Sequence, residues 1–227
     1  MYENEKKVAA IEALKYVQSN MKLGLGTGST TEFFLEALGE KVKSGELKNI
    51  TGVPTSKKTE KLVNSYGIQT FSNLDSIDID FDGADEYDSS GNLIKGGGGA
   101  LVREKIVAYN SKMVFIMVDS SKFSEKLHKF PLPVEILPFM EEKTKLNIEK
   151  LGCEATFRDN KNFKSDNGNY IIDCKFDYTH TDLEEKIKMI PGVVEVGIFK
   201  NITTRIFEGR NGECHIKNIK KSQFHFI

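Results

Sequence analysis

The sequence is organised around Asp82-Gly-Ala-Asp85-Glu86-Tyr-Asp88 and, after a short connection, Lys95-Gly-Gly-Gly-Gly99-Ala-Leu-Val-Arg-Glu104. Residues 89–92 are turn formers, so the chain is expected to fold back and bring carboxylates, a lysine and the glycines together. Glycines have no Cβ, so their backbone N–H groups can approach a ligand closely. Residues 100–108 have a helical pattern, and a helix start adds free N–H groups and a positive dipole end. The run therefore predicts an anion-binding loop that leads into a helix.

Glu104 follows about one turn inside this predicted helix, where it can face the loop. A carboxylate beside N–H donors suits the removal of a proton next to a carbonyl, because the base takes the proton and the donors hold the developing oxyanion. Taken alone, a glycine run is more often a linker and a helical glutamate more often faces solvent. The strand-like residues 77–81 precede Asp82, however, and open α/β sheets bind ligands at the carboxyl ends of their strands. The combination favours a functional site.

A second loop has the sequence Gly24-Leu-Gly26-Thr-Gly28-Ser-Thr-Thr31. It follows a predicted strand at residues 21–25 and precedes a predicted helix at 32–42, the arrangement of a phosphate cradle made of N–H groups and hydroxyls. The Walker loop and the dinucleotide fingerprint do not fit, since the first needs a Gly-Lys pair and the second has Ser29 where its third glycine or alanine belongs. The alternative is an ordinary strand-to-helix turn, in which the hydroxyl residues are only caps.

Composition limits the classes of function. The 227 residues carry 32 basic and 33 acidic side chains, so no overall field favours a nucleic acid or a membrane surface. The three cysteines, Cys153, Cys174 and Cys214, have no CxxC spacing, which indicates reduced thiols and a cytoplasmic location. The chain opens without an apolar signal segment, and its longest apolar run, residues 113–118, is too short to span a bilayer. The four histidines have no metal-ligand spacing, and no metal is expected.

The order of predicted elements indicates an α/β fold with two lobes. Helical and strand patterns alternate through the first part of the chain, which predicts a Rossmann-like parallel sheet covered by helices. From residue 131 the order becomes βαββαβ, with a turn at Asp166-Asn-Gly-Asn169, which indicates a ferredoxin-like α+β lobe. The predicted domains are 1–130 together with about 200–227, and 131–199. The expected helices are 5–17, 32–42, 56–66, 100–108, 140–151 and 183–189, and the expected strands are 21–25, 50–53, 68–71, 77–81, 112–118, 132–137, 153–158, 170–176, 193–199, 202–207 and 214–219.

A polar cluster, Asp119-Ser-Ser-Lys122, ends the strand predicted at 112–118. Lys122 is therefore expected at the same sheet edge as the two loops. A lysine in such a place is more often a surface charge, and contact with a ligand is the alternative.

Several motifs together resemble ribose-5-phosphate isomerase, type A. They are residues 24–31, Asp82-Gly-Ala-Asp85-Glu86, Lys95-Gly-Gly-Gly-Gly99-Ala, Glu104-Lys105, Ser121-Lys122, Phe130-Pro-Leu-Pro-Val-Glu135, Asp166-Asn-Gly-Asn169 and Ile190-Pro-Gly-Val-Val194. The resemblance implies an aldose-ketose isomerase of the non-oxidative pentose phosphate pathway, which interconverts D-ribose 5-phosphate and D-ribulose 5-phosphate without metal or organic cofactor. It also implies a homodimer or homotetramer whose partner is this small substrate and neither a nucleic acid nor a membrane. Where the family commonly has Asn before a glycine, this chain has Val196, which bears on a local turn or a subunit contact.

Residue by residue, the resemblance implies Glu104 as the catalytic base, Asp82 as an aid to ring opening and Lys95 at the reacting end. Ring opening exposes a C1 aldehyde, Glu104 removes the C2 proton, and the glycine-loop N–H groups and Lys95 hold a cis-enediol until the proton returns at C1. The implied substrate-binding residues are Lys6, Thr27, Gly28, Ser29, Thr30, Asp82, Gly83, Ala84, Asp85, Lys95, Gly96, Gly97, Gly98 and Lys122.

Two other functions stay open on the sequence. A CoA transferase would use the glutamate as a nucleophile beside a glycine loop, although no nucleotide site is evident. A sugar-phosphate sensing module would keep the phosphate loop without needing Glu104, although no helix-turn-helix or basic patch is present.

Overall fold

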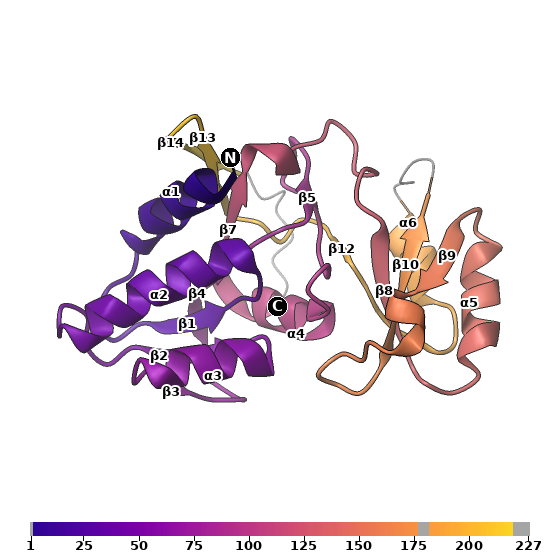
Figure 1. The fold of residues 1–227 in the computed structure, drawn as a ribbon, viewed down its shortest axis with the longest axis horizontal. Coiled ribbons are helices and arrows are strands. Elements are labelled where there is room, and N and C mark those ends of the chain that lie inside the picture. Colours follow the sequence, from indigo (N-terminus) through magenta and orange to yellow (C-terminus); the bar gives the residue numbers. More distant parts are fainter. Residues whose placement is uncertain (1, 177–181, 220–227) are drawn as a thin grey trace. The chain divides into compact units, whose positions relative to one another are not determined.

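The computed structural model describes residues 2–176 and 182–219, and these form two compact units (Figure 1). The first unit comprises residues 2–84, 103–122 and 200–219, and the second comprises 85–102, 123–176 and 182–199. The contacts thus place residues 85–102 and 123–130 with the second unit, whereas the division made from the sequence places them with the first. Two of the four histidines, His180 and His225, lie outside the described residues.

The first unit contains a seven-stranded sheet in the order β14-β13-β7-β4-β1-β2-β3. All neighbouring strands pair in parallel except the β13–β14 hairpin, which confirms the predicted Rossmann-like sheet and the return of the C-terminal strands to it. The strands are β1 (Lys22–Leu25), β2 (Thr51–Pro54), β3 (Gln69–Thr70), β4 (Ile77–Asp82), β7 (Ser111–Asp119), β13 (Arg205–Arg210) and β14 (Glu213–Asn218). The helices are α1 (Tyr2–Leu14), α2 (Ser29–Lys43), α3 (Lys57–Ser65) and α4 (Leu101–Tyr109), and a 3-10 turn, η1 (Ser120–Lys122), follows β7.

Three helix boundaries lie three residues away from the sequence pattern, and the first of them is the start of α1, at Tyr2 and not at residue 5. α1 ends at Leu14, before the predicted residue 17, because Tyr16 and Val17 donate to the carbonyls three residues back and tighten the chain into a turn. α2 begins at Ser29, three residues before the predicted start, because Gly28 with φ +135° ends the loop and Glu32 N–H already donates to the Gly28 carbonyl at 2.9 Å. The hydroxyl residues that follow Gly28 therefore form the first turn of a helix.

The two faces of the first sheet differ in character. On one face Leu23, Leu25 and Phe81 pack into an apolar core with α1 and α2, which lie side by side in Figure 1. The Phe34 and Phe81 rings stack there with centroids 4.3 Å apart. Because side chains alternate along a strand, Asp80 and Asp82 of β4 point to the other face.

Helix α4 covers that second face. A Cβ on Gly24 of β1 would lie 2.6 Å from Val107 Cγ1 of α4 and 2.5 Å from Asp80 Oδ1, so only glycine lets the helix approach the strand this closely. The face that carries the β4 carboxylates is therefore the one that α4 packs against.

The second unit contains a four-stranded antiparallel sheet in the order β11-β8-β10-β9. Its strands are β8 (Leu132–Ile136), β9 (Glu154–Phe157), β10 (Tyr170–Lys175) and β11 (Val193–Val196); its helices are α5 (Glu141–Glu149) and α6 (Leu183–Lys188), with a 3-10 turn, η2 (Arg158–Lys161), after β9. The chain order βαββαβ and this strand order confirm the predicted ferredoxin-like lobe. Val196 is fully buried in its apolar core and pairs with Val134, so the residue that departs from the family pattern serves packing.

The predicted strand at 193–199 is wrong as a single element. It is split at Gly197 into β11 and β12 (Ile198–Phe199), and β12 joins a separate three-stranded sheet with β5 (Glu86–Tyr87) and β6 (Leu93–Ile94). Gly197 donates to the Pro133 carbonyl and accepts from Lys95 N–H, each at 2.8 Å, and a Cβ there would lie 2.4 Å from the Lys95 carbonyl oxygen. Gly197 therefore lets one segment serve two sheets. The short strands β5 and β6 flank the turn at 89–92, whose fold-back is confirmed.

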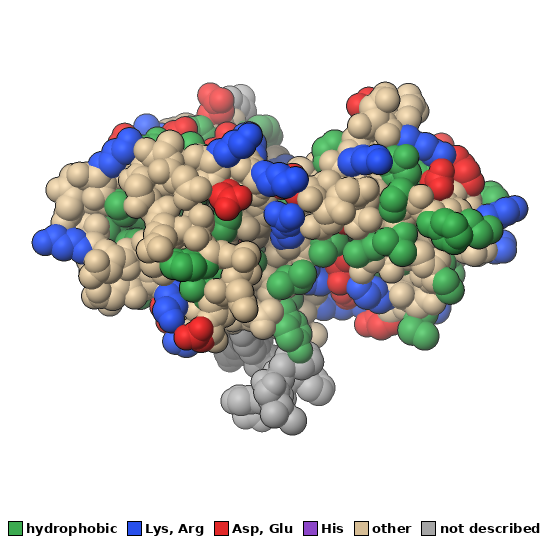
Figure 2. Space-filling model, turned by 90° about the horizontal axis from the view of Figure 1, so that it is seen from below, with side chains coloured by type: hydrophobic (Ala, Val, Ile, Leu, Met, Phe, Trp, Pro, Cys, Tyr) green, Lys and Arg blue, Asp and Glu red, His purple; other side chains and the backbone are tan. Residues whose placement is uncertain are grey.

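The described part of the chain contains no helix long and apolar enough to cross a membrane. On the face shown in Figure 2, basic and acidic side chains both occur among uncharged ones, as the balanced composition predicts.

Candidate active site

The loop at residues 26–31 joins β1 to α2. Gly26 N–H donates to the Phe81 carbonyl at 3.0 Å, which ties the loop to the neighbouring strand β4. Gly28 caps α2 without a side-chain hydrogen bond, so no cap side chain occupies the N–H groups of the first helical turn. These N–H groups and the hydroxyls of Ser29 and Thr30 lie together at a helix start, an arrangement that suits an anion.

Thr27 is held by a cluster of hydroxyls from the β2–α3 connection. Thr27 Oγ1 lies 2.7 Å from Thr55 Oγ1, 2.9 Å from Ser56 Oγ and 3.2 Å from Thr59 Oγ1. Thr59 Oγ1 also donates to the Gly26 carbonyl at 2.8 Å. The cluster fixes the start of the loop. Its members were not identified from the sequence, although the Ser56 cap accepting from Thr59 N–H is a recognisable helix-start signal.

The two predicted lysines lie on different elements of the first unit. Lys6 Nζ of α1 donates to Ser29 Oγ at 3.0 Å, which places this cation beside the start of α2. Lys122 is the last residue of η1, which follows the carboxyl end of β7. Glu5 fastens that turn to α1, since its Oε2 accepts from Ser120 N–H at 3.0 Å and Ser120 Oγ at 2.7 Å. These donors, the Ser120 hydroxyl first, lower the pKa of the Glu5 carboxyl.

Asp82 joins the two loops of the first unit. Its Oδ1 accepts from Thr27 N–H at 3.2 Å and from Gly83 N–H at 2.7 Å, so the carboxylate spans the loop at residues 26–31 and the Gly83-Ala84 segment. A Cβ on Gly26 would lie 2.2 Å from Asp82 Oδ1, which shows how closely the loop passes the carboxylate. Asp82 is 1% exposed.

Glu104 is also buried, at 3% exposure, on α4. It precedes Val107 by three residues and therefore shares the helix face that packs on the sheet. Because Asp82 points to the same face of the sheet, the structure places both carboxylates on one side of it.

The second unit holds Asp85 and the glycine loop at residues 95–99. Asp85 Oδ2 accepts from Gly97 N–H at 2.7 Å, and a Cβ on Gly97 would lie 2.5 Å from Asp85 Oδ1. Gly96 and Gly99 have φ of +105° and +81°, and Gly99 N–H donates to the Gly96 carbonyl at 2.9 Å, so glycine is required in this turn. The Lys95 side chain is 3% exposed and its Nζ lies 5.7 Å from the Phe199 ring centroid.

Arg158 and Phe163, which also contact the glycine loop, were not identified from the sequence. Arg158 Nη1 donates to the Gly96 and Gly97 carbonyls at 2.8 and 3.1 Å. The Phe163 ring occupies the space that a Gly99 side chain would need. No local pattern marks either residue, because their contacts join positions some sixty residues apart.

The buried side chains of these elements include the carboxylates of Asp82 and Glu104, which can take up and return protons. Within residues 2–176 and 182–219, no group of three or more His, Cys, Asp or Glu side chains could hold a metal ion. An α/β sheet with a glycine-containing loop at a helix start and a buried carboxylate at a strand end is the arrangement of a class of α/β enzymes that act on small phosphorylated substrates.

The comparisons with known proteins narrow this class. The family model of ribose 5-phosphate isomerase A (phosphoriboisomerase A) matches residues 51–213. The chain is 64% identical over 220 residues to ribose-5-phosphate isomerase A of Picrophilus torridus, covering 97% of this chain and all of that one. A solved ribose 5-phosphate isomerase of Plasmodium falciparum is 41% identical, with a TM-score of 0.90, over 98% of this chain and 100% of that one. A solved D-ribose-5-phosphate isomerase in complex with phospho-erythronic acid is 39% identical, with a TM-score of 0.92, over 96% of this chain and 99% of that one.

The chain belongs to the ribose 5-phosphate isomerase A family. It is an isomerase of the pentose phosphate pathway that interconverts ribose 5-phosphate and ribulose 5-phosphate.

Proposed function

We propose that the chain performs this isomerisation through a cis-enediol, with Glu104 as the base that carries the proton between C2 and C1. The observation that carries the proposal is the burial of Glu104 on the face of α4 that packs over the sheet, on the same side as Asp82. A buried carboxylate has few competing water molecules around it, which suits a base that takes a proton from one carbon and delivers a proton to the next.

The phosphate is assigned to the loop at residues 27–30, with Lys6 and Lys122 as the cations. Support comes from the helix start after Gly28, its hydroxyls, and the hydrogen bond of Lys6 to Ser29 Oγ. Binding energy from this remote group positions the sugar for reaction.

The sugar is assigned to residues 82–85 and the reacting end to Lys95, Gly96, Gly97 and Gly98. Asp82 assists ring opening, and the glycine-loop N–H groups and Lys95 stabilise the negative charge of the enediolate. The relative that was solved with phospho-erythronic acid holds a phosphorylated sugar acid. Such an acid has a carboxylate where the reacting end of this substrate develops charge, so it is the natural probe for the same positions in this chain.

Glu104→Gln tests the proposal. In deuterated water the wild-type enzyme should incorporate solvent deuterium at the carbon that receives the proton, to the extent that the proton exchanges before its return. Glu104→Gln keeps the shape but not the basicity, so it should lose both isomerisation and incorporation while still binding phospho-erythronate. Glu60→Gln, an exposed position on α3, is the matched control and should keep both. Most of the isomerase activity persisting in Glu104→Gln would remove Glu104 as the base, and a covalent adduct of Glu104 with an acyl-CoA would favour a transferase.

We infer further that the enzyme works in the cytoplasm as a homodimer or homotetramer, without nucleic-acid or membrane partners. The balanced charge of the chain and its three cysteines without CxxC spacing support a cytoplasmic location. Light scattering on the purified protein gives the mass in solution, and a monomer at working concentration would contradict the oligomer.

A further inference from the structure

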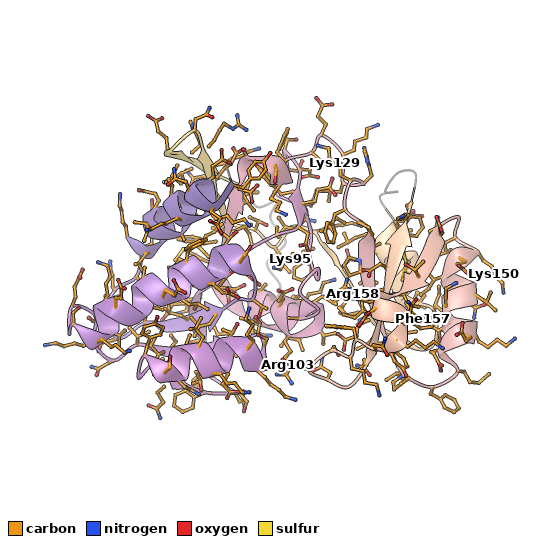
Figure 3. All side chains as sticks on the ribbon, viewed as in Figure 1. Lys95, Arg103, Lys129, Lys150, Phe157 and Arg158 are labelled. Carbon is orange, nitrogen blue, oxygen red and sulfur yellow. The ribbon has the colours of Figure 1, made fainter. Side chains whose placement is uncertain are left out.

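We propose that Arg158 is a positioning residue for catalysis, which fixes the peptide planes of the glycine loop at residues 95–99. This inference rests on the role proposed above for that loop in holding the enediolate. All the contacts that carry it lie within the second unit, where Figure 3 labels Arg158 and Lys95, the residue that begins the loop.

The guanidinium group binds two successive carbonyls of the loop. Arg158 Nη1 donates to Gly96 O at 2.8 Å and to Gly97 O at 3.1 Å. The described peptide bonds are all trans, and in a trans peptide the N–H of a residue points opposite to the preceding carbonyl. Drawing the Gly97 carbonyl toward Arg158 therefore turns the Gly98 N–H to the opposite side of the loop. That N–H is the donor that Arg158 presents to the developing oxyanion.

Arg158 is itself held rigidly. Its Nε donates to Asp173 Oδ2 at 3.0 Å and its Nη2 donates to Asp173 Oδ1, so one edge of the guanidinium meets the carboxylate through two parallel hydrogen bonds. Asp173 lies on β10, an inner strand paired on both sides by β8 and β9. The Phe163 ring centroid lies 5.6 Å from the Arg158 guanidinium carbon. The remaining amino group of the guanidinium, Nη1, is thereby directed at the loop.

Both polar groups of the Gly97 backbone are hydrogen-bonded to side chains. Its N–H donates to Asp85 Oδ2 at 2.7 Å, while its carbonyl accepts from Arg158. Glycine has no side chain to restrict its own rotation, and four in a row would sample many conformations. The two side chains supply the restraint that the sequence of the loop lacks, which is what preorganised donors require.

Lysine and methionine substitutions separate positioning from charge. Arg158→Lys keeps the positive charge, but an ammonium group cannot hold two carbonyls and both oxygens of Asp173 in the planar geometry of the fork. Arg158→Met keeps the length of the chain and removes charge and donors together. The matched control is Lys161→Met in the same turn, which removes ion pairs to Glu141 at 3.1 Å and Glu142 at 2.6 Å. Lys161 forms these ion pairs with the first turn of α5 and has no assigned role in the reaction.

The experiment measures kcat, KM and thermal midpoint for the four proteins, with amide hydrogen exchange of the peptide that covers the loop. A donor misplaced by about 1 Å costs ~10²-fold, so kcat of Arg158→Met should fall about 10- to 100-fold while KM changes less than about threefold, because the phosphate loop is untouched. Arg158→Lys should recover only part of kcat. Exchange in the loop should be faster in both Arg158 variants, and Lys161→Met should match the wild type. Should Arg158→Met fail to fold, Asp173→Asn supplies the second variant, with the same split between kcat and KM.

Full activity in Arg158→Lys would show that charge alone is sufficient and would overturn the positioning role. An unchanged kcat in Arg158→Met, or a rise in KM with kcat intact, would overturn it as well. Failure of the proposed function looks different, since Glu104→Gln would then remain active whatever the Arg158 variants do.

Discussion

Gly26→Ala tests the tie between the phosphate loop and Asp82. Gly26 does not have a positive φ, so alanine fits its backbone conformation and the effect comes from the added Cβ alone. That Cβ would lie 2.2 Å from Asp82 Oδ1 and 2.7 Å from Asp82 Cα, and the second of these atoms cannot move without the strand.

The magnitude follows from these distances. Ordinary contact begins at 3.4 Å, so the carboxylate must retreat by about 1 Å. Oδ1 then loses its hydrogen bonds to Thr27 N–H and Gly83 N–H, which are 3.2 and 2.7 Å long in the unaltered protein. If Asp82 acts on the substrate as proposed, a displacement of this size should cost ~10²-fold in kcat/KM. Overpacking costs about 1–3 kcal/mol of folding free energy.

Gly52→Ala on β2 is the control. Its Cβ would lie 2.3 Å from Leu25 Cδ1, on the face of the sheet that holds the apolar core and away from Asp82. Both variants should unfold at lower denaturant concentration. Initial rates of ribulose 5-phosphate formation should fall only in Gly26→Ala. Equal kcat/KM in the two glycine variants would refute the placement of Asp82 in the reaction.

Four further outcomes are expected. Alanine at both Ser29 and Thr30 should raise KM about 10²- to 10⁴-fold, since each of the two lost hydrogen bonds to a charged group is worth about 1.5–3 kcal/mol. Ribose without phosphate should be a very poor substrate in a direct rate comparison. Glu5→Gln should lower the free energy of unfolding by about 1–3 kcal/mol at pH 7. Because folding lowers the pKa of the Glu5 carboxyl from about 4.5, the stability difference between the two proteins should disappear in urea titrations as the pH falls through the folded pKa. Iodoacetamide at pH 8, read by mass spectrometry, should modify Cys153 before Cys214, because the Cys174 thiol lowers the pKa of Cys153 while burial raises that of Cys214 to about 11. Exhaustive chelation should leave isomerase activity intact, and recovery of lost activity on adding a divalent ion would contradict the metal-free mechanism.

The sequence by itself determined the elements and the chemical groups. Alternating strand and helix patterns predicted the parallel sheet, and the βαββαβ order predicted the ferredoxin-like lobe, because both signals are periodic and local. The run from Asp82 to Glu104 indicated a carboxylate base next to an anion loop for the same reason: the residues are close in the chain, and glycine, carboxylate and helix start each have a chemical meaning of their own.

Tertiary structure decided how those groups are held. The residues near Gly97 in the sequence do not predict that Arg158 donates a hydrogen bond to the Gly97 carbonyl. Those near Thr27 do not predict that Asp82 accepts a hydrogen bond from the Thr27 N–H. The split of residues 193–199 at Gly197 likewise depends on hydrogen bonds to Pro133 and Lys95, which lie far away in the chain. Local propensity is silent on such contacts, because their free energy is gained only when distant segments pack together and each buried polar group finds its partner.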